Sequence, residues 1–285
     1  MLSAPTRPAP PPSRVPQTRA ERHSLTFERP AANTGHRIAL YGPGGIGKTT
    51  LADLAPGPVA SFDLDDSLAV LQPEHTQRIA GIETWHDLRA ALNGDGWDEV
   101  RTLVIDSATK AEELAVAWTL AHVPHEKGQR VSRLEDYGYG RGFGHVYETF
   151  LTLLGDLDRH VRAGRNVILI CHDCVSSVPN PQGEDWLRYE PRLQSPSSGK
   201  ASIRLRVREW CDHVFFLGYD VVVAENKGRG CGTRTLWPVE MPHCMAKSRK
   251  LSDPIPVPPN DTAVWDALFG KPNPRKEEES NARES

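Results

Sequence analysis

The sequence has no long apolar run, no excess of positive charge and no even set of cysteines. No stretch approaches the roughly 18 consecutive apolar residues that a membrane-spanning helix needs, and the N-terminus shows no continuous apolar core of a secretory signal. A formal net charge of −3 excludes a surface that is basic throughout, so any nucleic-acid contact must come from a local basic patch. The five cysteines do not match the paired framework of a small secreted protein. We therefore expect a soluble, cytoplasmic protein without a membrane partner.

Both ends of the chain are poor in residues that could be buried. Residues 1–35 are rich in proline and arginine, and residues 271–285 are strongly charged. We expect both segments to be disordered tails. The arginines of the first tail could touch nucleic acid or a partner, although a solvated tail is the favoured interpretation. The remainder, residues 36–270, is long enough for one sizeable core and is predicted to be a single domain.

Between the tails, short apolar runs alternate with longer helix-like stretches, which is typical of a mostly parallel sheet covered by helices. The predicted strands are 37–42, 59–64, 101–106, 166–172 and 213–219, followed by a pair near 220–224 and 233–239. In residues 144–163 apolar side chains recur at steps of three and four, so this segment is predicted to be a helix. Residues 202–210 fit a strand or a helix, and their position before another strand favours a crossover helix. A short helix at 261–269 is expected to close an α/β domain.

Residues 42–49, GPGGIGKT, fit the pattern G-x-x-x-x-G-K-[ST] and are called the phosphate loop below. An apolar strand precedes the loop and a helix-like stretch follows it, as this motif requires. Its glycines let the backbone wrap so that N–H groups point inward, and the helix N-terminus adds positive potential. Lys48 would reach the outer phosphates, and Thr49 would ligate magnesium. The predicted nucleotide contacts are Gly42, Pro43, Gly44, Gly45, Ile46, Gly47, Lys48, Thr49 and Thr50.

Carboxylates at strand ends are expected to complete this site. A second magnesium ligand should lie at the tip of a buried strand, and the sequence TLVIDS supplies Asp106 there. Hydrolysis also needs a group that orients or deprotonates the attacking water. The sequence SFDLDDS offers Asp63, Asp65 and Asp66 for this role. The residues alone do not show which of the three acts on the water, and Asp66 could instead cap a helix.

Three further features follow the later strands. His172 ends the run NVILIC and could sense the terminal phosphate or make only a structural hydrogen bond. The CHDC sequence at 171–174 invites a zinc or redox interpretation, but no second well-spaced pair follows, so buried structural thiols are favoured. The alternating glycines at 137–144 lack the preceding strand that a dinucleotide-binding fingerprint requires.

The ordered set GPGGIGKTT, FDLDDSLAVL, LVIDSAT, DYGYGRGFGHVYETF, NVILICHD and MAKSRKLSDPIPV resembles RecA-like ATPases. Within that family it is similar to the phage-encoded ATP-binding proteins that include RecA-like single-strand annealing proteins. The resemblance covers residues 37–257 and implies a three-layer RecA-like P-loop NTPase with a mostly parallel central sheet, so that 36–270 would be a RecA-like ATPase domain.

The resemblance also implies roles for single residues. Asp65 would be the catalytic carboxylate, and His172 would couple the bound phosphate to DNA-binding loops. Lys247 and Arg249, a basic pair spaced two apart, would reach the nucleotide of a neighbouring subunit. The RecA members usually carry glutamate and glutamine where this chain has Asp65 and His172. A shorter carboxylate must reach further or act through a water molecule.

By the same resemblance, two loops at 124–143 and 174–200 would hold single-stranded DNA. Aromatic rings in such loops can stack with bases while guanidinium groups meet phosphates. The first loop offers Lys127, Arg130, Arg133, Arg141, Tyr137, Tyr139 and Phe143, and the second offers Trp186, Arg188, Tyr189, Arg192 and Lys200. Acidic residues in both loops weaken the positive electrostatic potential. Two alternatives to DNA binding therefore stay open: the loops could contact protein partners, or they could only cover the sheet.

Taken with the resemblance, the sequence predicts a magnesium-dependent ATPase, slow or stimulated by DNA, that promotes annealing or recombination in phage DNA metabolism in the host cytoplasm. ATP would control self-association into a ring or filament, with Lys247 or Arg249 completing the neighbouring site. A single-strand-binding protein or a replisome component is a further expected partner. Two alternatives stay open: a nucleotide-dependent adaptor or loader for a helicase or recombinase, and a P-loop kinase whose lid lies in residues 174–200.

Overall fold

The structure, a computed structural model, describes residues 26–27, 34–197, 199–224 and 227–270. Apart from residues 26–27 and 34–35, the two predicted tails lie outside the described residues. The chain divides into a unit over Met1–Ala32 and a unit over Asn33–Ser285. All described helices and strands belong to the second unit. Within the described ranges, no helix combines the length and the hydropathy that a membrane span requires.

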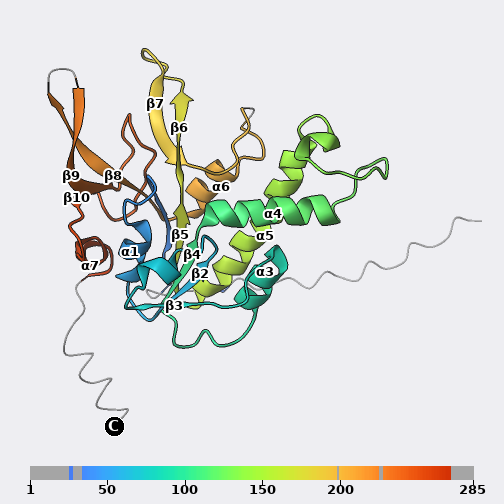
Figure 1. Ribbon diagram of the computed structural model, residues 1–285, viewed down its shortest axis with the longest axis horizontal. Coiled ribbons are helices and arrows are strands. Elements are labelled where there is room, and N and C mark those ends of the chain that lie inside the picture. The colour runs from blue at the N-terminus through green and yellow to red at the C-terminus, as the bar shows by residue number, and fades with distance from the viewer. Residues whose placement is uncertain (1–25, 28–33, 198, 225–226, 271–285) are drawn as a thin grey trace, which may run out of the picture. The chain divides into compact units, whose positions relative to one another are not determined.

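In the described part of the chain, eight strands form one sheet with the order β10-β9-β8-β1-β5-β4-β2-β3 (Figure 1). The strands are β1 (Arg37–Tyr41), β2 (Val59–Asp63), β3 (Thr76–Arg78), β4 (Thr102–Asp106), β5 (Asn166–Cys171), β8 (His213–Ala224), β9 (Lys227–Trp237) and β10 (Ile255–Pro256). From β8 to β3 every neighbouring pair is parallel, whereas β9 is antiparallel to both of its neighbours. The predicted mostly parallel sheet is therefore confirmed.

Successive residues of the central strands enter two different cores, because side chains alternate between the two faces of a strand. On β1, Ile38 and Leu40 contribute to one core and Ala39 and Tyr41 to the other. One core is covered by α3 (Trp85–Asn93), α4 (Ala108–His122), α5 (Arg141–Arg162) and α6 (Ile203–Trp210), and the other by α1 (Lys48–Asp53) and α7 (Ala263–Phe269). The result is the predicted three-layer arrangement.

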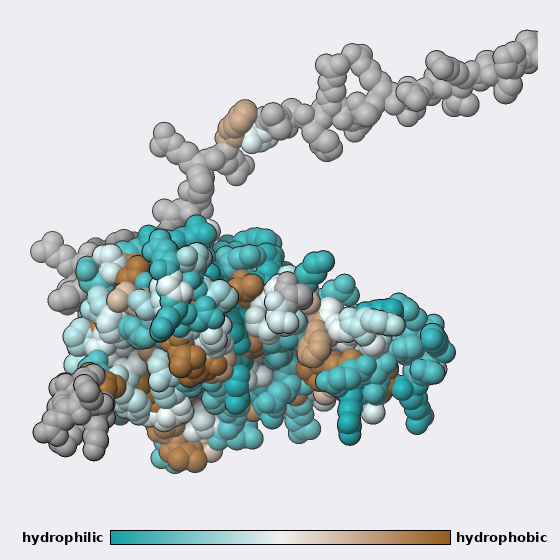
Figure 2. Space-filling model, turned by 90° about the horizontal axis from the view of Figure 1, so that it is seen from above, coloured by the Kyte–Doolittle hydropathy of each residue, from teal (hydrophilic) through white to brown (hydrophobic). Residues whose placement is uncertain are grey.

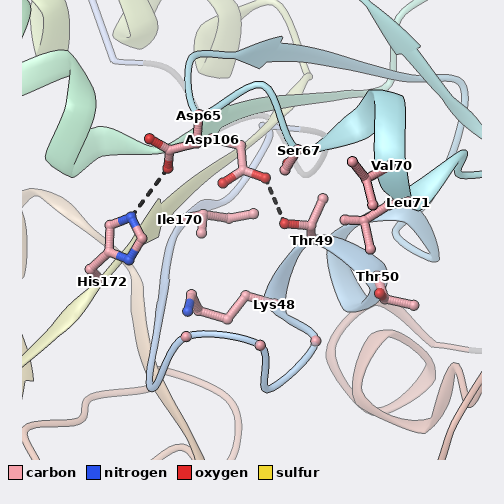
Figure 3. Close-up of a pocket in the computed structure, with 13 residues that line it drawn as sticks. Lys48, Thr49, Thr50, Asp65, Ser67, Val70, Leu71, Asp106, Ile170 and His172 are labelled. Carbon is pink, nitrogen blue, oxygen red and sulfur yellow. Dashed lines mark hydrogen bonds and ion pairs between the residues drawn. The ribbon is translucent and has the colours of Figure 1, made fainter.

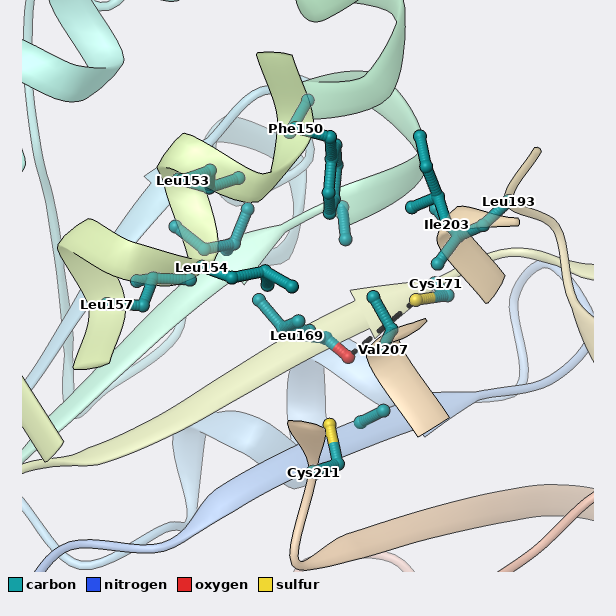
Figure 4. Close-up of a cluster of buried hydrophobic side chains, with 14 of the residues drawn as sticks. Phe150, Leu153, Leu154, Leu157, Leu169, Cys171, Leu193, Ile203, Val207 and Cys211 are labelled. Atoms are coloured by element: carbon teal, nitrogen blue, oxygen red, sulfur yellow. Dashed lines mark hydrogen bonds between the residues drawn. The ribbon is translucent and has the colours of Figure 1, made fainter. Parts of the chain in front are cut away.

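The helices α5 and α6 confirm two predictions made from periodicity. In Figure 4, the apolar face of α5, with Phe150 and Leu153, packs above Leu169 of β5. The buried residues of α6 are four apart, as a helix requires, and the Ser202 hydroxyl accepts a 3.1 Å hydrogen bond from the Leu205 amide at its start. This N-cap settles the strand-or-helix ambiguity of residues 202–210 in favour of the helix.

The prediction of a long loop at 174–200 is wrong for much of this range. In place of a loop, β6 (Asp173–Val178) and β7 (Trp186–Pro191) form an antiparallel hairpin. Pro179, Pro181 and Gly183, which favoured a loop, lie between the two strands in the turn at residues 179–185. The first predicted loop, 124–143, contains a short 3-10 helix at Leu134–Tyr137.

The predicted strands 213–219 and 220–224 are one continuous strand, β8, which lies between β9 and β1 and has an irregular register between Tyr219 and Val221. A further short helix, α2 (Leu68–Leu71), follows β2 and was not predicted.

Candidate functional site

A cavity of about 400 Å³ lies where β1, β2, β4 and β5 end (Figure 3). Because these strands are parallel, their carboxyl ends meet at the same sheet edge. The predicted site residues that line this cavity are Gly44, Gly45, Gly47, Lys48, Thr49, Thr50, Asp65, Asp106 and His172. Residues far apart in the sequence are therefore brought together at one site.

The phosphate loop has backbone positions that only glycine fits. Gly42 has φ +156°, and a Cβ atom there would lie 2.1 Å from the carbonyl oxygen of Leu217. Gly47, directly before α1, has φ 97° in the left-handed region. No side chain caps the first turn of α1, so its N–H groups remain available to an anion. The local sequence thus builds an open cradle between β1 and α1.

Lys48 extends across this cradle (Figure 3). Its side chain is buried, and Nζ donates hydrogen bonds of 2.7 Å to the Gly42 oxygen and 2.9 Å to the Pro43 oxygen. Burial lowers the pKa of the ammonium, and the nearby carboxylates of Asp173 and Asp106 act in the opposite direction. The amine is therefore held directly over the loop that would receive phosphates.

Thr49 and Asp106 form the second part of the site. The Thr49 hydroxyl donates a 2.6 Å hydrogen bond to Oδ2 of Asp106. Burial raises the pKa of the Asp106 carboxyl, and the hydrogen bond from Thr49 offsets part of this effect. Both side chains offer hard oxygen ligands, and magnesium usually takes its remaining ligands from water and substrate phosphates. These residues therefore fit the predicted magnesium site.

The three aspartates after β2 have different positions. Asp63 is buried and accepts a 2.8 Å hydrogen bond from the Ser67 amide at the start of α2, and it also pairs with Arg78 at 3.4 Å. Asp66 is exposed and pairs with Arg78 at 2.7 Å. Only Asp65 of the three lines the cavity. The capping role considered for Asp66 thus belongs to Asp63, and the geometry favours Asp65 as the residue that faces a substrate.

His172 connects this cavity to the hairpin. Its Nε2 atom lies 3.2 Å from Oδ2 of Asp65 (Figure 3). Its backbone N–H donates to the Thr109 hydroxyl at 3.1 Å, and that hydroxyl donates to the Arg192 carbonyl at 3.2 Å. The Arg192 N–H in turn donates to the His172 carbonyl at 2.8 Å. The strand-end histidine is therefore tied both to Asp65 and to the segment that follows β7.

Lys247 and Arg249 do not line the cavity. The Lys247 ammonium donates to the carbonyls of Arg208, at 3.0 Å, and Cys211, at 2.6 Å, at the C-terminal end of α6. Arg249 lies 3.3 Å from Asp212 and its side chain is 68% exposed. Both basic residues thus have partners within the chain, helix-end carbonyls for Lys247 and a carboxylate for Arg249. Their contact with a neighbouring nucleotide stays a prediction.

Two residues at the site were not predicted from the sequence. Asp173, the first residue of β6, is the carboxylate that raises the pKa of Lys48 most. Its place directly after His172 at a strand end was an available signal in the sequence. Arg234 of β9 donates from Nη1 to the Ile46 carbonyl in the phosphate loop and from Nε to the Val257 carbonyl at 2.8 Å. No sequence pattern marks Arg234, because its contact with the loop depends on strand order.

Of the two cysteines at 171–174, Cys171 has the buried environment predicted for a structural thiol, whereas Cys174 is only partly buried. Cys171 is fully buried at the end of β5, and burial raises the pKa of its thiol to about 12. Across the described ranges, no group of three or more His, Cys, Asp and Glu side chains could hold a metal ion. A zinc site at 171–174 is therefore not supported.

Two residues predicted to face DNA are buried. Tyr137 is 4% exposed, and its hydroxyl donates to the Val123 carbonyl at 2.7 Å. Arg188 is 7% exposed and pairs with Glu190 at 2.6 Å. In contrast, Tyr139 is 98% exposed. The predicted roles of Tyr137 and Arg188 in stacking and phosphate contact are therefore wrong for this conformation.

The fold and the site together define a nucleotide-binding protein of the P-loop NTPase class. Residues 34–250 match the family described as AAA domain, and the chain belongs to that family. No curated protein matches the chain. Among solved structures, it is similar to a KaiC-like protein of the hyperthermophilic archaeon Pyrococcus horikoshii OT3, with 15% identity, a TM-score of 0.42, and coverage of 78% of this chain and 85% of that chain. The family match and the observed sheet confirm the predicted α/β fold class, a three-layer P-loop NTPase with a mostly parallel sheet.

Proposed function

We propose that the protein binds magnesium ATP in this cavity, hydrolyses it, and uses the nucleotide state to control its binding to single-stranded DNA. The observation that carries the proposal is the placement of Asp65 and His172 in the same cavity as Lys48 and the Thr49–Asp106 pair (Figure 3). Phosphate-binding groups and a carboxylate that can act on water are both needed for hydrolysis.

The phosphate loop and Lys48 would bind the β- and γ-phosphates of ATP, exchanging the Lys48 contacts to Gly42 and Pro43 for phosphate oxygens. Thr49 and Asp106 would hold magnesium, which supplies neutralisation of the phosphate charge when it is bound. Asp65 would accept a proton from the attacking water or orient it. His172, through its 3.2 Å contact, would keep the Asp65 carboxylate turned toward the cavity.

The DNA contact is proposed for residues 123–140, the segment between α4 and α5 that projects beyond the sheet in Figure 1 and is called the arm below. Tyr139 at the end of the arm is almost fully exposed, and the Arg141 guanidinium carbon lies 5.8 Å from the centre of its ring. Exposed cations of the arm are Lys127, Arg130 and Arg133. This end of the unit is coated mostly with hydrophilic side chains (Figure 2). An exposed ring beside cations suits single-stranded nucleic acid.

A path between the two proposed sites runs through Thr109. Its hydroxyl contacts the backbones of both His172 and Arg192. A shift of His172 toward a γ-phosphate would therefore move the segment after β7 as well. The segment after β7 in turn contacts the base of the arm, because Nε2 of Gln194 donates a 2.9 Å hydrogen bond to the Phe143 carbonyl in the first turn of α5. This chain of contacts would couple nucleotide binding to DNA binding, and the annealing or recombination role in phage DNA metabolism belongs to the same proposal.

Self-association into a ring or filament is also part of the proposal. The exposed side chain of Arg249 can reach a second subunit, whereas Lys247 is held at the end of α6. Of the predicted pair, Arg249 is therefore the residue proposed to complete the neighbouring site. A kinase is disfavoured because the segment assigned as its lid is largely the β6–β7 hairpin, whose Arg188 is buried in ion pairs.

The proposal is tested by phosphate release from ATP, with and without a single-stranded oligothymidine, for the wild type, Asp65→Asn and Asp66→Asn. Asp65→Asn should bind ATP and lose turnover by about 100-fold or more, the range expected for a catalytic base. Asp66→Asn is the matched control, because its side chain is exposed and paired with Arg78, and it should keep turnover. Wild-type turnover in Asp65→Asn would overturn the hydrolysis proposal, and labelled phosphate on an acceptor would indicate a kinase.

A further inference from the structure

Arg234, a residue of the antiparallel part of the sheet, contacts the phosphate loop on the side away from the cavity that Lys48 lines. Tyr219 of β8 pairs with Arg234 of β9, so the arginine lies one strand beyond the neighbour of β1. Its side chain reaches back to the loop and donates from Nη1 to the carbonyl of Ile46. A Cβ atom on Gly47 would lie 2.1 Å from the same Nη1 atom. The guanidinium thus packs directly against the Ile46–Gly47 peptide.

The guanidinium is itself held in place by β9 and the segment after β10. Its Nε atom donates to the Val257 carbonyl at 2.8 Å, and the Val257 N–H donates to the Arg234 carbonyl at 2.9 Å. Two N–H groups of this planar, fork-shaped guanidinium therefore bind two backbone carbonyls, one in the phosphate loop and one in the segment after β10. Such a fork has little freedom to turn, and hydrogen bonds from a charged donor are stronger than neutral ones.

This contact fixes the direction of an N–H group in the phosphate loop. The Ile46–Gly47 peptide is not among the cis bonds of the described residues, and in a planar trans peptide C=O and N–H point to opposite sides. Since the Ile46 oxygen points at Arg234, the Gly47 N–H points away from it. Arg234 lines a second cavity of about 550 Å³ behind the loop, whereas Gly47 lines both that cavity and the one that holds Lys48. The Gly47 amide is therefore directed toward the side where phosphate would bind.

We infer that Arg234 is a positioning residue of the nucleotide site: by binding the Ile46 carbonyl, it holds the Gly47 amide in the orientation that receives a phosphate oxygen. This inference rests on the proposed nucleotide binding. Without Arg234, the Ile46 carbonyl loses its partner and the peptide can rotate, so each binding event has to reorder the loop. The free-energy cost of this reordering weakens nucleotide binding, whereas the position of Asp65 is unaffected.

The experiment measures the affinity of a fluorescent ATP analogue with magnesium for the wild type, Arg234→Met, Arg234→Lys and Arg234→Ala. Arg234→Met keeps the length of the side chain but removes both hydrogen bonds and the charge, and it should bind about 10- to 100-fold more weakly. Arg234→Lys can serve only one of the two carbonyls and should fall between the wild type and Arg234→Met. Arg206→Met on α6 is the matched control, because Arg206 is exposed and pairs only within its helix, with Glu209.

Chemical rescue separates positioning from a general loss of stability. In Arg234→Ala, the second cavity opens behind the loop, so guanidinium ion at millimolar concentration should restore affinity at least several-fold, while Arg234→Met, whose side chain fills the space, should show no rescue. Methylammonium is the control ion. Wild-type affinity in Arg234→Met, or full affinity in Arg234→Lys, would overturn the inference. Failure of the wild type itself to bind the analogue would instead contradict the proposed function.

Discussion

The Thr49 hydroxyl and the Asp106 carboxylate lie 2.6 Å apart although 57 positions separate them in the sequence. The strand order brings them together, because β4 pairs with β5 and β5 pairs with β1, so that one strand lies between the end of β4 and the phosphate loop. The Asp106 carboxylate is buried, and burial raises its pKa. The site therefore keeps an unfavourable buried charge, which is a common property of functional residues.

This burial predicts opposite effects of Asp106→Asn on stability and on activity. The folded-state pKa of Asp106 lies above its unfolded value, so its contribution to stability is largest at low pH and declines as pH rises. A neutral amide of the same size should therefore raise the free energy of unfolding of the nucleotide-free protein at pH 8. It should also lower magnesium-dependent turnover by 100-fold or more, because a neutral ligand holds magnesium poorly. Thermal unfolding and phosphate release check the two effects, with exposed Asp98→Asn as the control.

The raised pKa of Glu112, a residue of α4, predicts that the stability of the fold depends on pH. Burial raises the pKa of this carboxyl to about 7, while the hydrogen bond from the Gln194 amide and the charge of Arg204 act against it. Since the folded-state pKa exceeds the unfolded one, the folded protein binds more protons, and stability should fall as pH rises from about 4.5 to about 7. Glu112→Gln should flatten this part of the profile and be more stable than the wild type at pH 8 by about 2–3 kcal/mol.

The Glu112 prediction is checked by urea unfolding at several pH values. Glu113→Gln is the matched control, because its side chain is exposed and pairs with Lys110. A profile for Glu112→Gln with the same slope as the wild type between these pH values would show that another group is responsible.

Substitutions at two neighbouring tyrosines should have different effects, one on DNA affinity and the other on the stability of the fold. Tyr139→Ala should weaken binding to single-stranded DNA by about 1–2 kcal/mol, the range for one stacked base, and should leave thermal unfolding unchanged because the ring is exposed. Tyr137→Phe should do the reverse, since it removes the buried hydrogen bond to Val123 at a cost of about 1 kcal/mol. Fluorescence anisotropy with a labelled oligothymidine is the measurement. Unchanged DNA affinity in Tyr139→Ala would remove the arm from the proposed DNA site.

A shared nucleotide site predicts complementation between two inactive variants. Lys48→Ala lacks its own site but offers Arg249 to a neighbour, and Arg249→Ala keeps its own site but offers no arginine. Each alone should have little turnover, and a mixture should recover part of the wild-type rate. Lys247→Ala should instead destabilise the fold by about 1–2 kcal/mol, because its ammonium binds the carbonyls at the end of α6. If Arg249→Ala alone is fully active, the shared site is contradicted.

The parts of the fold that could be predicted are those set by local patterns. The buried parallel strands are continuous apolar runs, and α5 repeats apolar residues at helical spacing, so β1, β4, β5 and α5 are found within a few residues of their predicted bounds. The glycines, lysine and threonine of the phosphate loop follow a spacing that is rare outside nucleotide-binding loops. In contrast, the β6–β7 hairpin was predicted as a loop because proline and glycine in its turn outweighed the alternating residues of its strands.

The missed site features depend on contacts between segments distant in the sequence. Arg234 meets Ile46 across 188 positions, and nothing around Arg234 distinguishes it from other strand arginines. Lys247 was assigned to a neighbouring subunit through the family resemblance. The sequence could not reveal its partners, the last carbonyls of α6, because every sequence contains backbone carbonyls. The residues alone could not distinguish Asp65 from Asp63 and Asp66, because the distinction depends on the direction of each side chain.

The most direct measurement is equilibrium titration of the wild type and Lys48→Ala with magnesium ATP. Because the Lys48 ammonium is held over the phosphate loop, its removal should weaken ATP binding by about 100-fold or more, consistent with loss of a charged group on a phosphate. The circular dichroism spectrum of the nucleotide-free protein should stay the same. Wild-type affinity in folded Lys48→Ala would contradict the assignment of this cavity as the nucleotide site.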